Sequence, residues 1–167
     1  MNKTGKIALY GVLTALAMIL SYVESQIPAF VAVPGVKIGL TNIVVVTSLY
    51  MLGNKGAMAI NFVRIAAVAL LFGNAMSFSF SFAGGMLATI VMILLKKSGK
   101  FAVTGVSVAG GLCHNIGQIL MAMVLLNTNS IFWYLPVLWA SGIVSGFIIG
   151  IIGAMVISRI PLDENKF

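Results

Sequence analysis

Hydrophobic residues along the chain fall into six long runs, and short segments rich in Gly, Pro, Asn and Ser separate them. Transmembrane helices need about 20 predominantly apolar residues to cross a bilayer, and the separating segments have turn-forming composition. The pattern predicts an all-α integral membrane protein with a single transmembrane domain over residues 1–167. Its six predicted spans are approximately Ile7–Val23, Val36–Leu52, Ala57–Phe72, Phe78–Leu95, Phe101–Leu126 and Phe132–Ile157.

Composition supports a membrane location. Hydrophobic residues make up 60% of the 167 residues and charged residues only 8%, and the mean hydropathy is +1.12. A soluble domain of this length would need far more charge to cover its surface. These values exclude a soluble globular protein.

The positive charges lie at one set of connections between the spans and at the chain ends. The chain has 10 Lys and Arg residues against 3 Asp and Glu residues, a formal net charge of +7. Positively charged connections stay on the cytoplasmic side of a membrane, so we expect both termini inside. This topology accounts for the charge without a nucleic-acid partner. The cations that support it are Lys3, Lys6, Lys55, Lys96, Lys97, Lys100, Arg159 and Lys166.

Small residues four positions apart mark helix-packing faces, because they let two helix backbones approach closely. We expect the stripe in the last span to pack inside the bundle, and the pair in the first span to be available to a partner subunit. The stripe consists of Gly142, Gly146, Gly150 and Ala154, and the pair of Gly11 and Ala15.

Polar side chains lie inside the predicted spans. Arg64, near the middle of the third span, is costly there unless it is paired or solvated. Two interpretations stay open: hydrogen bonding between helices, with Glu24 neutralising Arg64, or a ligand cavity that opens outward and favours an anionic group. The predicted substrate-binding residues are Lys37, Asn42, Arg64, His114, Asn115 and Gln118, with Met121, Phe78, Phe80 and Trp133 as apolar walls.

The chain lacks the residues of several catalytic and transport classes. It has no GxxxxGK[ST] loop for nucleotide hydrolysis, and no acidic residue in the middle of a span, where ion-coupled carriers usually have one. Trans-prenyl diphosphate synthases hold magnesium through aspartate-rich clusters, whereas this chain has one aspartate, Asp163. We therefore predict a protein that is not an enzyme and holds no metal or cofactor.

Five segments together resemble the Gx transporter family, which is labelled heptaprenyl diphosphate synthase component I. The resemblance covers nearly the whole chain and keeps the order of the motifs. That family is similar in turn to the substrate-binding S components of energy-coupling factor (ECF) transporters. The segments are PGVKIGLTNIVVVTSLYMLG, RIAAVALLFG, SFAGGMLA, VSVAGGLCHNIGQILMA and YLPVL.

The resemblance implies a six-helix, S-component-like membrane protein in the bacterial cytoplasmic membrane. Such proteins capture a vitamin-like micronutrient and dock on a T subunit that is bound to two ATPases. Their first helix carries an AxxxA contact motif, for which Gly11 and Ala15 are the nearest match here. The alternative is a noncatalytic membrane component of heptaprenyl or polyprenyl diphosphate synthesis, with a prenyl diphosphate synthase as partner.

Overall fold

The computed structural model describes residues 3–26 and 39–159 of the chain. These residues form six α-helices and one short 3₁₀ helix, and the described ranges contain no β-strand. The prediction of an all-α protein is confirmed. In chain order the elements are α1 (Lys3–Gln26), α2 (Asn42–Met51), α3 (Gly53–Leu71), α4 (Ala75–Ser98), α5 (Val103–Leu126), η1 (Ser130–Tyr134) and α6 (Leu135–Arg159).

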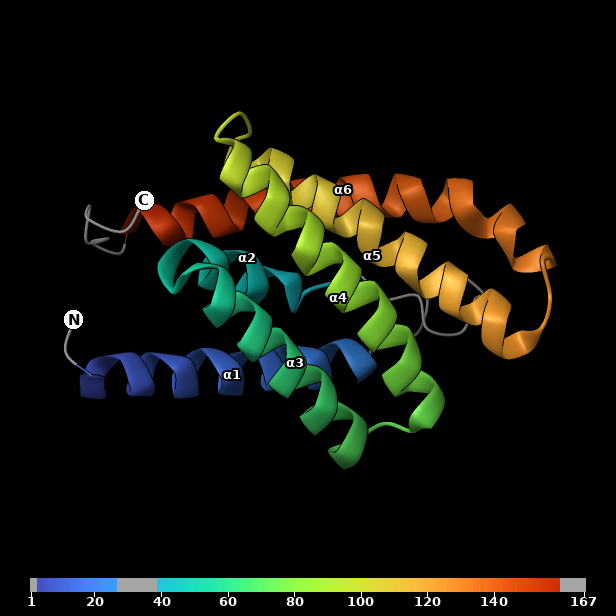
Figure 1. Ribbon diagram of the computed structural model, residues 1–167, viewed down its shortest axis with the longest axis horizontal. Coiled ribbons are helices and arrows are strands. Elements are labelled where there is room, and N and C mark those ends of the chain that lie inside the picture. Colours follow the sequence, from blue (N-terminus) through green and yellow to red (C-terminus); the bar gives the residue numbers. More distant parts are fainter. Residues whose placement is uncertain (1–2, 27–38, 160–167) are drawn as a thin grey trace.

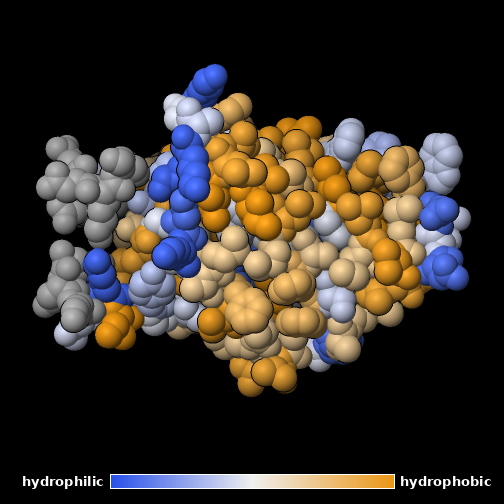
Figure 2. All heavy atoms as spheres, viewed as in Figure 1, coloured by the Kyte–Doolittle hydropathy of each residue, from blue (hydrophilic) through white to orange (hydrophobic). Residues whose placement is uncertain are grey.

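Five helices, namely α1, α3, α4, α5 and α6, are long and apolar enough to cross a membrane. Large apolar side chains such as Ile7, Leu70 and Val124 are exposed on their outer faces. Figure 2 shows a broad apolar band across the middle of the bundle, with hydrophilic side chains toward the two ends of its long axis. Such a surface suits a bilayer with polar regions on both sides. The chain is therefore a multi-pass membrane protein.

α2 is shorter than the second predicted span. It covers 10 residues and is about 15 Å long at 1.5 Å per residue, whereas the hydrocarbon core is about 30 Å thick. It cannot cross a membrane by itself. The prediction extended this helix back to Val36, but the chain over residues 39–41 is not helical, and residues 36–38 lie outside the described part.

The short helix α2 is buried among the other helices. Val44, Val45, Val46 and Leu49 each expose 1% of their surface or less. α2 packs against α3 and α6 and touches α1, α5 and α4. A helix that is apolar on all sides and enclosed in this way belongs to the core of the bundle.

The chain alternates between the two ends of the bundle (Figure 1). α1 begins and α6 ends at one end, and the junction between α2 and α3 also lies toward that end. α1 runs from that end past the middle of the bundle, and α2 runs back toward it before α3 begins. The most extensive helix contacts join α5 to α6 and α4, while α3 packs against α4, α2 and α1.

Candidate functional site

Arg64 is the charged side chain in the middle of α3, and it is buried. It exposes 6% of its surface, and its Nη2 donates a hydrogen bond to Oδ1 of Asn61, one turn earlier on the same helix. Asn61 Nδ2 donates in turn to Gly85 O and Thr89 Oγ1 of α4, both at 2.9 Å. Arg64 Nε has no hydrogen-bond partner among the described residues. A buried donor without a partner is costly, so it is available to a ligand.

Gly85 gives Arg64 and Asn61 the space that they occupy. A Cβ atom at this position would lie 2.9 Å from Cδ1 of Ile65 and 3.2 Å from Nδ2 of Asn61. Arg64 Nη2 would be 3.6 Å away from it. A methyl group at this position would therefore require the side chains of Ile65 and Asn61 to shift.

Glu24, near the end of α1, is a buried carboxylate whose charge acts on this arginine. It exposes 6% of its surface, and its charge interacts with that of Arg64. Oε1 of Glu24 accepts a hydrogen bond from the backbone N–H of Gly39. Beside it, the hydroxyls of Ser21 and Thr41 are hydrogen-bonded at 2.9 Å. These two contacts tie α1 to the segment that leads into α2.

A hydrogen-bonded turn precedes α2. Asn42 N donates to Gly39 O at 2.8 Å, and Ile43 N donates to Leu40 O at 3.1 Å. The backbone N–H of Gly39, at the start of this turn, donates to Glu24. The turn lies at the N-terminal end of α2, where the partial positive charge of a helix favours an anion. The carboxylate of Glu24 occupies that place.

His114 and Gln118 approach from the other side of α4. They expose 7% and 6% of their surfaces and face Gly84, where a Cβ atom would lie 2.8 Å from Gln118 Cγ and 3.4 Å from His114 Cε1. Since Gly84 and Gly85 are neighbours on α4, the His114–Gln118 pair and the Arg64–Asn61 pair lie at the same level of the bundle. The structure thus brings both polar pairs to one Gly-Gly step of α4.

Asn115 lies apart from these residues. Its Nδ2 donates to Leu138 O of α6 at 2.6 Å, and a Cβ atom at Gly142 would lie 2.8 Å from that nitrogen. The amide therefore holds α5 and α6 together at their interface. The ligand site that we propose below omits Asn115.

The glycine stripe of α6 runs along the same interface. Cβ atoms at Gly146 and Gly150 would lie 2.7 Å from Val108 Cα and 2.6 Å from Thr104 Cα, both in the backbone of α5. Contacts this short leave no room for a side chain. Ala154, the last member of the predicted stripe, is partly buried.

The remaining predicted residues are spread over the molecule. Asn42 exposes 8% of its surface at the start of α2, and Lys37 lies outside the described residues. Gly11 and Ala15 are on the exposed face of α1, and a Cβ atom at Gly11 would meet nothing within 4 Å. Of the predicted apolar walls, Phe80 is buried, whereas Trp133 on η1 exposes 83% of its surface.

Sequence reasoning did not identify the contributions of Gly39, Thr89 and the Gly84–Gly85 pair. One signal for the pair was present, because glycine has low helix propensity and two in succession within a span indicate close packing. The bond between Glu24 and Gly39 had no signal in the sequence, since it joins two segments 15 positions apart.

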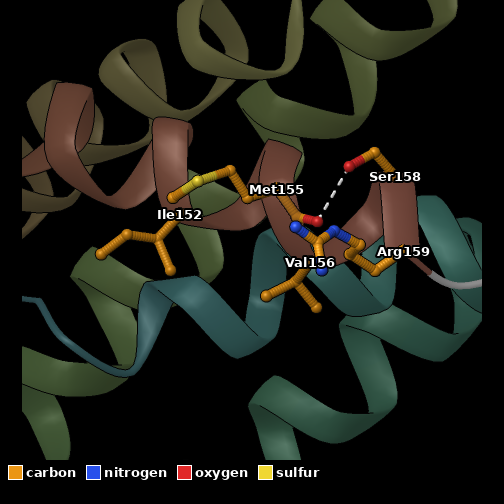
Figure 3. Close-up of a pocket in the computed structure, with 5 residues that line it drawn as sticks. All are labelled: Ile152, Met155, Val156, Ser158 and Arg159. Carbon is orange, nitrogen blue, oxygen red and sulfur yellow. Dashed lines mark hydrogen bonds between the residues drawn. The ribbon is translucent and has the colours of Figure 1, made fainter.

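A separate pocket lies along the last turns of α6 (Figure 3). Its volume is about 460 Å³, and it is lined by Ile152, Met155, Val156, Ser158 and Arg159. Ser158 Oγ donates to Met155 O at 2.9 Å, so its hydroxyl is bonded to its own helix. The pocket therefore combines apolar side chains with one cation, at the end of the bundle where α1 begins.

No group of three or more His, Cys, Asp or Glu side chains that could hold a metal ion occurs within residues 3–26 and 39–159.

A family model described as "Heptaprenyl diphosphate synthase component I" matches residues 13–156. Comparison with curated proteins and with solved structures gives no match. The matched range runs from α1 to the last turns of α6 and includes Glu24, Arg64, His114 and Gln118.

Proposed function

The chain belongs to the heptaprenyl diphosphate synthase component I family, and from that premise we propose that it is a substrate-capturing membrane component, similar to the S components of ECF transporters. It binds a small amphipathic, anionic micronutrient in the core of the bundle. The observation that supports this function is the buried guanidinium of Arg64, whose Nε has no partner in the described part of the chain. A purely structural arginine would satisfy its donors within the protein.

The proposed ligand site lies around the Gly84–Gly85 step. Arg64 binds the anionic group, and His114 and Gln118 of α5 offer hydrogen bonds, with Asn42 at the start of α2 kept as a predicted member of the site. The predicted contribution of Lys37 remains part of the proposal. Because the site is buried, each hydrogen bond to an ionised group is stronger than in water.

The proposed topology has six crossings with both termini in the cytoplasm of a bacterium. The direction of α2, which runs back toward the end of the bundle where α1 begins, supports the second crossing. The cations Lys55, Lys96, Lys97 and Arg159 lie at the ends of helices that meet at one end of the bundle. Such a distribution favours the cytoplasmic side for that end.

Docking on a T subunit with two ATPases supplies the energy in this proposal, since the sequence has no nucleotide-binding loop. The exposed face of α1 around Gly11 and Ala15 is the proposed contact. Its small residues let a partner helix approach closely, and nothing in the described structure covers Gly11.

The second candidate function is that of a noncatalytic membrane component in heptaprenyl or polyprenyl diphosphate synthesis. The family description favours it, and so does the pocket on α6, whose apolar wall and Arg159 suit the hydrocarbon and the phosphate of a prenyl phosphate. Its partner would be a prenyl diphosphate synthase.

One purification separates the two functions. The protein is isolated from its own membranes in mild detergent, and both the bound small molecule and the co-purified subunits are identified by native mass spectrometry. Capture predicts a T subunit, ATPases and a ligand that is lost in Arg64→Ala but kept in Arg159→Ala. A prenyl synthase as partner, with a prenyl phosphate lost in Arg159→Ala alone, would instead establish the second function.

A further inference from the structure

Large aromatic side chains are exposed on and beside η1, the 3₁₀ helix that joins α5 to α6. Trp133 on η1 exposes 83% of its surface, and its neighbours Phe132 and Tyr134 are also exposed. Trp139, one turn into α6, is exposed as well. Both tryptophans of the chain therefore lie at the end of the bundle opposite to the one where α1 begins and α6 ends (Figure 1).

The surface of the chain changes from apolar to polar at the same place. The last residues of α5, 124–126, are exposed Val and Leu side chains, whereas the next four, 127–130, are Asn, Thr, Asn and Ser. Exposed aliphatic side chains suit the hydrocarbon of a bilayer, and polar ones suit its aqueous side. η1 begins at Ser130, so it lies where the surface passes from one environment to the other.

The length of α6 indicates the same boundary. Arg159 is in the last turn of α6, and a cation at the end of a membrane helix marks the edge of the bilayer. Trp139 precedes it by about 20 residues, which is roughly 30 Å along the helix and equals the thickness of the hydrocarbon core. A tilt of about 20° shortens this span by only about 2 Å. η1 comes before Trp139 in the chain and therefore extends beyond the hydrocarbon.

We propose that η1 and the start of α6 bind the layer of phospholipid headgroups on this side of the membrane, with Trp133 among the headgroups and Trp139 at the edge of the hydrocarbon. An indole ring in this layer contacts acyl chains while its N–H donates to phosphate or ester oxygens. In water the ring would lose the apolar contact, and deep in hydrocarbon its N–H would lose the acceptor. Trp133, which the sequence suggested as a wall of the ligand cavity, contacts lipid instead.

This contact fixes the depth of the bundle in the bilayer. α5 and α6 share the most extensive helix contact of the described structure, and η1 joins them, so an anchor at η1 holds both helices. Arg159 holds the other end of α6 at the opposite boundary. The two ends together oppose movement of α6 along the membrane normal. The inference is independent of any ligand at Arg64.

Two proteins with a single tryptophan test this placement. Trp139→Phe leaves Trp133 as the one indole, and Trp133→Phe leaves Trp139, so each serves as the matched control of the other. Each full-length protein is reconstituted into phosphatidylcholine vesicles whose acyl chains carry bromine either near the headgroup or near the methyl end. Quenching of tryptophan fluorescence is measured in both kinds of vesicle, and separately with iodide present on both sides of the membrane.

We expect shallow bromine to quench Trp133 more than deep bromine does, and iodide to quench it in part. For Trp139 the ratio of deep to shallow quenching should be higher and quenching by iodide weaker. If either phenylalanine variant does not fold, tyrosine takes its place, because tyrosine does not absorb at the longest wavelengths that excite tryptophan.

Three results would overturn the proposal. Quenching of Trp133 by iodide but by neither brominated lipid would place η1 in water, and strongest quenching by deep bromine would place it in the hydrocarbon. Protection of Trp133 from all three quenchers would place it against protein or a bound molecule. Capture of a ligand by Arg64 is tested separately by native mass spectrometry, so the failure of either proposal leaves the other standing.

Discussion

The side-chain Nζ of Lys96, near the end of α4, donates a hydrogen bond to the backbone oxygen of Leu49 in the last turn of α2, at 2.8 Å. The same Nζ lies 4.9 Å from the centre of the Tyr50 ring. A cation favours the carbonyl end of a helix, because that end carries partial negative charge. Lys96 therefore caps the short helix from outside, at the end opposite to Glu24.

Removal of this cap should destabilise the protein. We expect Lys96→Met to lower the free energy of unfolding by about 1 kcal/mol, since it removes one charge-assisted hydrogen bond and a partly exposed cation–π contact. Thermal unfolding in detergent measures this loss. Lys97→Met is the matched control, because the neighbouring lysine is exposed. Equal effects of the two substitutions would contradict the capping role.

The second prediction concerns the arginine in the core. Arg64→Ala should abolish ligand retention while the protein still inserts and purifies, and Arg64→Lys should recover only part, because an ammonium lacks the planar fork of donors. Gln118→Ala should cost about 1 kcal/mol of binding free energy for one neutral hydrogen bond. Ligand affinity and thermal stability are measured on the same three variants. Normal ligand affinity in an Arg64→Ala protein of lowered stability would contradict the assignment of Arg64 to the ligand site.

The third prediction compares two glycines of the packing stripes. Gly146→Leu should lower stability by about 1–3 kcal/mol or prevent folding, because its side chain would enter the backbone of α5. Gly11→Leu should leave stability within about 0.5 kcal/mol, since it meets nothing in the described structure. Gly11→Leu should nevertheless release the T subunit during co-purification. If the Gly11→Leu protein still co-purifies with the T subunit, this face of α1 contacts lipid and not the T subunit.

The fourth prediction concerns the topology. In a protein with Cys113 replaced by Ala, single cysteines are introduced at Asn54, Ser98 and Asn129. Impermeant thiol reagents added to intact cells should label only position 129, in the connection between α5 and η1. Labelling at position 98 from outside would refute a model with both termini in the cytoplasm.

The hydrophobic pattern predicted most of the fold but misjudged the extent of α2. For α1, α3, α4, α5 and α6 each apolar run coincides with a helix, because a helix in lipid satisfies its own backbone and must be apolar on its outside. The residues before α2 are also apolar, and Gly39 has a φ of 85°, which a helix does not allow. Hydropathy shows which residues are kept away from water, but it does not show at which residue a helix begins or ends.

The candidate site was only partly predictable for a similar reason. Arg64 and Asn61 are three positions apart on one helix, so their proximity follows from sequence spacing. His114 and Asn115 are adjacent in sequence but about 100° apart around α5, and they face α4 and α6 respectively. Which neighbouring helix each face meets is decided by the packing of the whole bundle.

The short length of α2 also has a consequence for biogenesis. One end of this helix lies in the interior of the bundle, and its exposed backbone groups would be costly in lipid without Glu24 and the contacts of α1. At the other end it depends on Lys96 of α4. A nascent chain that has delivered only α1 and α2 to the bilayer has no donor for the Leu49 carbonyl at that second end. The translocation machinery must therefore hold this segment until α4 has been made, which places the completion of the core late in synthesis.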